Sequence, residues 1–222
     1  MKLNIQLFGG RGASSSYGEE GYDTSSDKKR KMRFYDKTNI YKGMSVTQFE
    51  ERVGKYRSEY IGLYDDNGKI MIAGTSYDKG AVSIPTTHPD FKKINSMTHT
   101  HPIEGTRQLG GSLSGADVQN TAILNFKSVR ARAPEKTYML RASKGTKQNA
   151  KKLYGIATLT DKKWDKNART RITKIKKKLS QKGKKISGAT ENKIYLGYGT
   201  RYWKRALTGT GYEYIEIRKK YR

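Results

Sequence analysis

Two of the three histidines in this chain lie two positions apart, in the run Thr98-His99-Thr100-His101-Pro102. Because alternate residues of a β-strand face the same side, both imidazoles can reach one ion if the run is extended. Downstream, the run Ser114-Gly115-Ala116-Asp117 opens an expected helix and supplies Asp117 as an anionic ligand. Two imidazoles and one carboxylate, with a water in the fourth position, are typical of a catalytic zinc site rather than a closed structural one.

Other features of the composition exclude several kinds of functional site. The chain has no cysteine, which excludes disulfides, thiolate metal ligands and a cysteine nucleophile. The third histidine, His88, precedes Pro89 in a turn-like stretch, and we interpret it as structural. No apolar run approaches the ~20 residues of a membrane span, so no membrane partner is expected.

Alternating and helical patterns predict a mixed α/β (α+β) chain, with a sheet and flanking helices. The clearest hairpin joins two β-rich runs across a turn that ends in Asn67-Gly68. Ser45 can cap the first helix, because its hydroxyl can accept a backbone hydrogen bond. The expected helices span Val46–Tyr56, Gly115–Phe126 and Lys162–Lys182, and the expected strands span Glu59–Tyr64, Lys69–Ala73, Ala81–Ile84, Ile94–Thr98, Ser128–Ala133, Thr137–Ala142, Lys193–Gly197 and Tyr212–Arg218.

Two of these helices have an identifiable apolar side. In the helix that follows Ser114, the residues expected to be buried are Ala116, Ile123 and Leu124. The last helix has apolar residues at helical spacing, with Lys and Arg on its other faces, and Gly183 ends it. The residues of that stripe are Trp164, Ala168, Ile172, Ile175 and Leu179.

The net charge is +26, and it is concentrated in the second half of the chain. Residues 1–125 hold 17 basic and 14 acidic residues, whereas residues 126–222 hold 29 and 6. Such a block indicates an anionic partner, most often DNA or RNA, although an acidic protein or a merely solvated surface would also explain it. The basic residues expected to bind the anion are Arg169, Arg171, Lys174, Lys176, Lys177, Lys178, Lys182, Lys184 and Lys185.

Aromatic residues follow this basic helix, interleaved with Lys204 and Arg205. Cations beside aromatic rings suit single-stranded nucleic acid, because charge follows the phosphates and rings stack on bases. The alternative is that the rings pack the late strands against the core. The aromatic residues are Tyr195, Tyr198, Tyr202, Trp203, Tyr212 and Tyr214.

Residues 1–40 are expected to form a flexible arm, because glycines, serines and the cluster Lys28–Lys31 are interrupted by few apolar residues. The opening, Met1–Gly12, resembles the leader of small proteins encoded in head-morphogenesis clusters of phages of Gram-positive bacteria. A low-complexity tail is the alternative. Met1–Phe8 lacks the apolar core of a secretory signal. These features predict a phage- or bacterium-encoded protein, located in the cytoplasm of a bacterial host or in a virion.

The candidate site resembles the signature of the JAMM/MPN+ (JAB domain) zinc metalloproteases, which is a Glu on an early strand, then H-x-H-P, then S-x-x-D. Here these are Glu59, the run from His99 to Pro102, and the run from Ser114 to Asp117. Gly62, three places after Glu59, also matches. The stretch between the proline and the serine, Ile103–Leu113, is longer than is usual in the family, and a loop absorbs such an excess at little entropic cost.

The resemblance covers roughly residues 41–145 and implies a JAB/MPN-like mixed sheet flanked by helices. Residues 146–222 would then be a basic extension of that core or an addition to it. The implied activity is zinc-dependent hydrolysis of a peptide or isopeptide bond in a protein substrate, such as a ubiquitin-like conjugate or a phage head protein. The implied zinc ligands are His99, His101 and Asp117, with Glu59 as the general base and Ser114 as a hydrogen-bond donor to the oxyanion.

Other interpretations stay open at this point. Glu50, Glu51 and Glu104 are substitutes for Glu59 as the base. The protein could instead be a basic nucleic-acid-binding protein that uses the JAMM fold as a scaffold, since fold alone does not fix function. A metal-dependent nuclease or toxin is the third interpretation, because two histidines and one aspartate also suit such a site.

Overall fold

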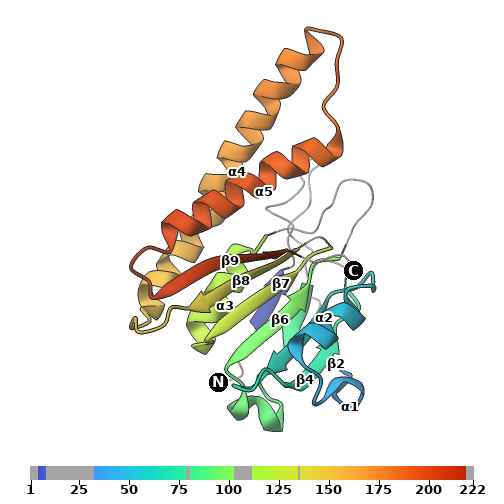
Figure 1. Ribbon diagram of the computed structural model, residues 1–222, viewed down its shortest axis with the longest axis vertical. Helices are drawn as coiled ribbons and strands as arrows, with labels where there is room; N and C mark the ends of the chain where they lie inside the picture. Colours follow the sequence, from blue (N-terminus) through green and yellow to red (C-terminus); the bar gives the residue numbers. More distant parts are fainter. Residues whose placement is uncertain (1–4, 9–32, 79–80, 103–111, 135, 219–222) are drawn as a thin grey trace, which may run out of the picture.

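The structure, a computed structural model, describes residues 5–8, 33–78, 81–102, 112–134 and 136–218. Within these ranges a seven-stranded mixed sheet has helices on both faces, and a separate two-stranded sheet lies beside it (Figure 1). The predicted mixed α/β class is therefore confirmed. Among the described residues no helix is both long and apolar enough to cross a membrane.

The strands of the large sheet follow the order β2-β4-β3-β6-β7-β8-β9. Only the β6–β7 pair is parallel among them, and its neighbours are antiparallel. The strands are β1 (Ile5–Phe8), β2 (Tyr35–Asp36), β3 (Tyr60–Tyr64), β4 (Ile70–Thr75), β5 (Ala81–Ile84), β6 (Ser96–Thr100), β7 (Ser128–Arg132), β8 (Lys136–Ala142) and β9 (Tyr212–Arg218), and the helices are α1 (Thr38–Tyr41), α2 (Val46–Val53), the 3-10 helix η1 (Pro89–Lys93), α3 (Gly115–Leu124), α4 (Ala150–Ser180) and α5 (Gly188–Ala206).

The register at the centre of the sheet fixes which side chains face which helix. Ile61 of β3 lies opposite His99 of β6, and Gly62 lies opposite Thr98. Because side chains alternate along a strand, Ile61 and His99 share one face and Gly62 and Thr98 share the other. Glu50 of α2 bonds to Thr98, whereas Asp117 of α3 approaches His99, so α2 and α3 cover opposite faces of the sheet.

On the α2 face, the helix is held close to the sheet. Ser45 caps α2 as predicted: its side chain accepts from the backbone of Gln48, and the Gln48 side chain accepts from the Ser45 backbone. Phe49 is fully buried and packs over Gly62, where a side chain would collide with the ring. The glycine three places after Glu59 is therefore required by the approach of α2.

Residues 150–218 form two helices and a strand, and the strand joins the same sheet. The antiparallel helices α4 and α5 form a hairpin that projects past the sheet, and the chain then returns as β9 (Figure 1). Strand β9 pairs with β8 from Lys136↔Arg218 to Ala142↔Tyr212. The basic extension therefore supplies an edge strand of the main sheet.

Several element predictions need correction. The run Lys193–Gly197 was predicted as a strand but lies within α5, which Ser187 caps by accepting from Thr190. Its Ile and Tyr residues favour a strand locally, yet Ile194 and Tyr198, four apart, are half-buried on one side of a helix. The predicted helix Lys162–Lys182 begins twelve residues earlier, at Ala150. Its buried stripe already starts at Leu153.

Smaller differences concern ends and burial. Helix α2 ends at Val53 rather than Tyr56, and α3 ends at Leu124 rather than Phe126. Ile123 was predicted to be buried but is 45% exposed, because α3 turns Val118 and Ala122 toward the core instead. Of the expected N-terminal arm, residues 5–8 form β1, which pairs with β5, while residues 1–4 and 9–32 lie outside the described residues.

Replacing Gly62 by Ala should destabilise the fold by about 1–3 kcal/mol, because overpacking forces a packed ring to move. The added Cβ would lie 2.7 Å from Phe49 Cε1 and 2.9 Å from Ile70 Cδ1. The control is Gly155→Ala in α4, where nothing lies within 4 Å and alanine favours the helix. Urea denaturation measures both free energies of unfolding, and equal midpoints for G62A and wild type would contradict the packing described.

Candidate metal centre

Strand β6 and helix α3 bring three metal-ligating side chains together. His99, His101 and Asp117 are 0%, 3% and 0% exposed. The Nε2 atoms of the two imidazoles are 2.9 Å apart, and His99 Nε2 lies 3.2 Å from Asp117 Oδ1. One ligand atom from each residue lies within 4.8 Å of the others, so the group can hold a metal ion. The sequence predicted these three residues as one site.

The helix N-terminus holds Asp117 in place. Ser114 is the N-cap of α3, and its hydroxyl accepts from the backbone N–H of Asp117 at 3.2 Å. In return, Asp117 Oδ2 accepts from the backbone N–H of Ser114 at 2.6 Å and from its hydroxyl at 2.9 Å. This capping box occupies Oδ2 and leaves Oδ1 directed at His99.

The polar atoms of the group fit a bound cation. Asp117 Oδ1 accepts no hydrogen bond among the described residues, although His99 Nε2 is close enough for an ion pair. Two imidazole Nε2 atoms at 2.9 Å both present lone pairs unless a proton or a cation lies between them. Burial raises the pKa of Asp117, but His99, His101 and the Ser114 backbone outweigh it and hold that pKa below its ordinary value. The carboxylate is thus in the form that a metal requires.

Glu59 lies beside this group on the neighbouring strand. Continuing the β3–β6 register by two residues from Ile61↔His99 places Glu59 opposite His101, on the face that both histidines share. Glu59 is fully buried. Its backbone is fixed on both sides, because its N–H donates to Asp78 and its carbonyl accepts from the Thr75 hydroxyl. Glu59 therefore lies on the sheet face of the metal group, one strand away from the two histidines.

The substitutes considered for Glu59 lie elsewhere. Glu50 is on the α2 face, where it forms a buried ion pair with Arg130 at 2.6 Å. Glu51 is exposed on α2, and Glu104 lies outside the described residues. His88 caps η1 through Nδ1, and its Nε2 lies 3.5 Å from Asp36, which confirms a structural role away from the metal group.

Three aromatic residues of the extension hold α3 at both ends, and the sequence did not indicate this. Trp203 Nε1 donates to the carbonyl of Leu113 at 3.0 Å, one residue before the Ser114 cap. The hydroxyls of Tyr214 and Ser112 are 2.8 Å apart, and Tyr212 donates to the Phe126 carbonyl beyond the other end of the helix. Burial raises the pKa of both tyrosines, which keeps them protonated at neutral pH.

These contacts correct part of the nucleic-acid interpretation. For Trp203, Tyr212 and Tyr214 the sequence left base stacking and packing against the core open, and their burial in the core favours the second. Their hydrogen-bond partners, Leu113, Ser112 and Phe126, lie 86 to 102 positions away in the sequence, so no local pattern could identify them. The side chain of Tyr195 lies outside the described residues.

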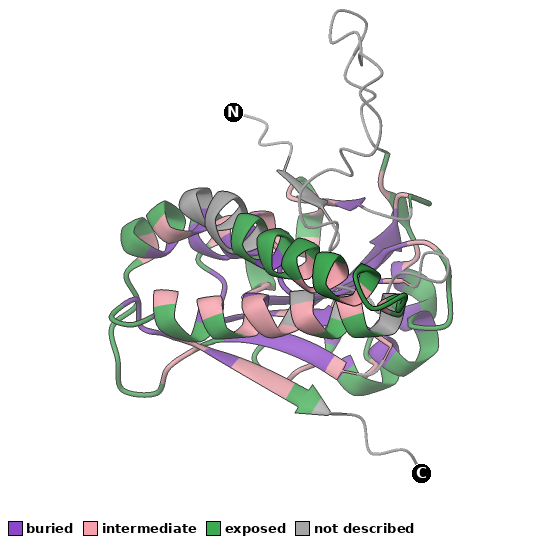
Figure 2. Cartoon of the chain, turned by 90° about the horizontal axis from the view of Figure 1, so that it is seen from above, coloured by how far each residue is buried: buried purple, intermediate pink, exposed green. Residues whose placement is uncertain are grey.

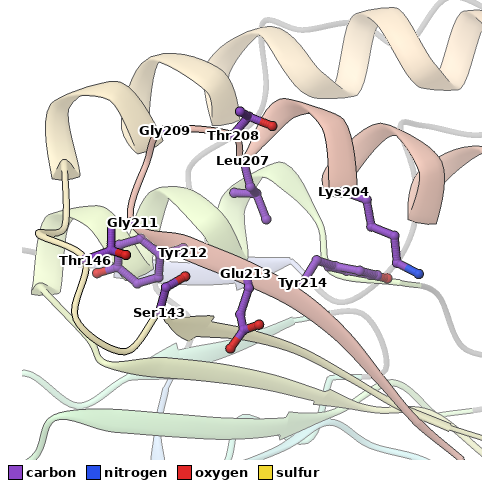
Figure 3. Close-up of a pocket in the computed structure, with 10 residues that line it drawn as sticks. All are labelled: Ser143, Thr146, Lys204, Leu207, Thr208, Gly209, Gly211, Tyr212, Glu213 and Tyr214. Carbon is purple, nitrogen blue, oxygen red and sulfur yellow. The ribbon is translucent and has the colours of Figure 1, made fainter.

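The structure also contains a pocket of about 410 Å³ that shares no residue with the metal group. It lies between β9, the end of α5 and the loop after β8 (Figure 3). Its lining residues are Ser143, Thr146, Lys204, Leu207, Thr208, Gly209, Gly211, Tyr212, Glu213 and Tyr214. Glu213 bonds to Arg141 across the β8–β9 pair, and Tyr214 bonds to Ser112, so these two lining groups serve the fold.

Comparisons with known proteins do not place the chain in a family. No protein-family model matches it, and neither a curated protein nor a solved structure matches it. The relation to JAMM proteases therefore stays a prediction that rests on the residues and their geometry.

Purified wild-type protein should bind about one divalent metal ion per chain, as the donor set of a single site requires. His99→Ala and Asp117→Ala should each lose it, because either change removes one of three ligands. Elemental analysis after metal loading and desalting measures the content. The matched control is His88→Ala, which removes a histidine outside the group and should retain the metal. Equal metal content in all four proteins would contradict the site.

Trp203→Phe should weaken metal binding by about 10-fold, as expected for a residue that supports a ligand indirectly. It should also destabilise the fold by about 1–3 kcal/mol, because the buried Leu113 carbonyl loses its donor. Competition with a chromophoric chelator measures the metal affinity. Tyr198→Phe on the same helix is the control, since the ring that Arg201 covers is kept. An affinity equal to that of the control would show that α5 does not support the site.

Proposed function

We propose that the protein is a zinc-dependent hydrolase of JAMM type that cleaves a peptide or isopeptide bond. The observation that carries the proposal is Glu59, a buried carboxylate on the same sheet face as His99 and His101. A group of three metal ligands alone serves many purposes. Hydrolysis also needs an acid that is not a metal ligand and can transfer a proton, and Glu59 fits this role because it lies on a different strand from the histidines.

Zinc is the metal that the donor set favours. Two imidazole nitrogens and one carboxylate oxygen are the ligands of open, catalytic zinc sites. Donor atoms around a tetrahedral zinc ion lie about 3.3 Å apart, since each bond is about 2.0–2.1 Å long. The distances of 2.9 Å and 3.2 Å from His99 Nε2 to His101 and Asp117 are close to this value. A zinc ion held there would polarise a carbonyl and lower the pKa of a water molecule beside it.

Glu59 would then move the proton. As the general base it takes a proton from the attacking water, and as the general acid it delivers that proton to the leaving amine. Its backbone is held by Asp78 and Thr75, and its side chain is completely buried, which limits the positions open to the carboxylate. A proton taken up there is passed to the amine nitrogen as the C–N bond breaks, which returns Glu59 to its carboxylate form.

Ser114 has a different part in this proposal from the one that the family resemblance implies. Its hydroxyl proton is directed at Asp117 Oδ2, so donating to an oxyanion would require the hydroxyl to rotate away. We therefore assign Ser114 as the residue that orients the Asp117 carboxylate. Outer partners of this kind commonly set the direction of a ligand.

The scaffold interpretation is less well supported by the burial pattern. A protein that kept the fold only as a scaffold would gain nothing from burying His99, His101, Asp117 and Glu59 together. Burying four ionisable groups costs stability, and apolar residues in their places would avoid that cost. Clusters of this kind are typical of functional sites.

Glu59→Gln should retain zinc and lose about 10²–10⁴ in hydrolysis rate, the usual contribution of a general base. The zinc-loaded protein is incubated with a library of linear and lysine-branched peptides, and mass spectrometry identifies new termini. Glu51→Gln, an exposed acid on α2, is the matched control and should cleave at the wild-type rate.

Two results would contradict the proposal. Cleavage that is equal in wild type and Glu59→Gln would exclude the assigned base. Absence of amide cleavage, together with metal- and Glu59-dependent cleavage of DNA or RNA, would indicate the nuclease instead.

A further inference from the structure

The α4–α5 hairpin carries a dense positive charge that the proposed hydrolase site does not use. Residues 166–205 include 14 Lys and Arg but a single acidic residue, Glu191. Glu191 forms an ion pair with Lys176, at 2.8 Å. The remaining 13 basic side chains are all exposed. The charge therefore faces solvent along both helices.

The hairpin places this charge on a rod that stands away from the sheet. Helix α4 has 31 residues, which corresponds to a length of about 46 Å. Its distal half and the turn to α5 project beyond the strands (Figure 1). Most residues of this part of α4 are exposed (Figure 2), and the exceptions lie at helical spacing on one side of the helix. A long partner can therefore reach the charged surface without contact with the metal group.

The apolar residues of the hairpin are already used. Ala168 is fully buried, and Ile172, Ile175 and Leu179, which continue its stripe, are half-buried. No large apolar side chain is exposed among the described side chains of residues 166–205. A protein partner usually needs aromatic or aliphatic anchors, and a membrane-binding helix needs an exposed apolar face. The described hairpin surface has neither apolar anchors nor an exposed apolar face, so we expect a partner to be attracted by charge.

We propose that the distal α4–α5 hairpin binds the phosphodiester backbone of a nucleic acid, without reading its sequence. Closely spaced cations on a narrow rod match a polymer that carries a charge on every phosphate, and counterion release supplies the binding energy. Because Trp203, Tyr212 and Tyr214 are buried, they offer no platform for unstacked bases. Tyr198 and Tyr202 are half-buried, and Arg201 covers the Tyr198 ring, so a duplex is the first ligand to test.

The test uses the full chain and a fluorescently labelled DNA duplex of about 20 base pairs, which is longer than the hairpin. Anisotropy gives the binding constant between about 50 and 200 mM salt. The variant combines Lys174→Gln, Lys177→Gln and Lys178→Gln, which lie on one outward side of α4 at helical spacing. Lys and Gln have similar helix propensities, so the hairpin should remain folded, as circular dichroism can check.

The control removes the same charge from exposed lysines outside the hairpin, through Lys55→Gln, Lys69→Gln and Lys92→Gln. Wild type and control should bind the duplex with a steep salt dependence. The hairpin variant should bind at least about 10-fold more weakly, with a log–log salt slope smaller by up to about 2.7, or about 0.9 per lost contact.

Further ligands distinguish the sources of the phosphate and the rival partner. Duplex RNA and single-stranded DNA of equal length show which nucleic acid is preferred, and binding of any of them through the hairpin supports the proposal. Equal affinities of the hairpin variant and the control would overturn it. Tighter binding of polyglutamate than of every nucleic acid would overturn it in favour of an acidic protein.

Discussion

Strand β6 pairs with β3 on one side and with β7 on the other, and this double pairing decides which face each of its side chains occupies. A slip of one residue would turn His99 and His101 toward α2 and expose threonines to α3. The α2 face resists such a slip, because Glu50 there accepts from Thr98 and from Arg130 in a buried network. A slip would remove the Thr98 hydroxyl from its place in that network.

Helix α3 is the second part of the same constraint, because it brings Asp117 to the histidines. Its position is set locally by the Ser114 cap and remotely by Trp203 and Tyr212, which bond to the backbone on either side of it. The basic extension thus has two parts. Strand β9 and the end of α5 complete the sheet and hold α3, whereas the distal parts of α4 and α5 project beyond the sheet.

The elements that depend on neighbouring residues in the sequence could be predicted from it. The two β-rich runs between Glu59 and Ala73, the spacing of His99 and His101 and the capping serine at 45 each predicted the observed element or site. The strand predicted at Lys193–Gly197 failed because its composition favours a strand, whereas packing in the α4–α5 hairpin requires a helix. The role of Trp203 depends on a partner 90 positions away, which no local pattern encodes.

That separation has a consequence for the order of events during synthesis. The ribosome delivers His99, His101 and Asp117 well before the residues that hold α3, since Leu113 and Trp203 are 90 positions apart and Ser112 and Tyr214 are 102. Contacts so distant in sequence form late in folding. A nascent chain therefore carries the three candidate metal ligands before the segment that supports α3 has emerged and docked, so the complete metal group forms only after nearly the whole chain has been synthesised.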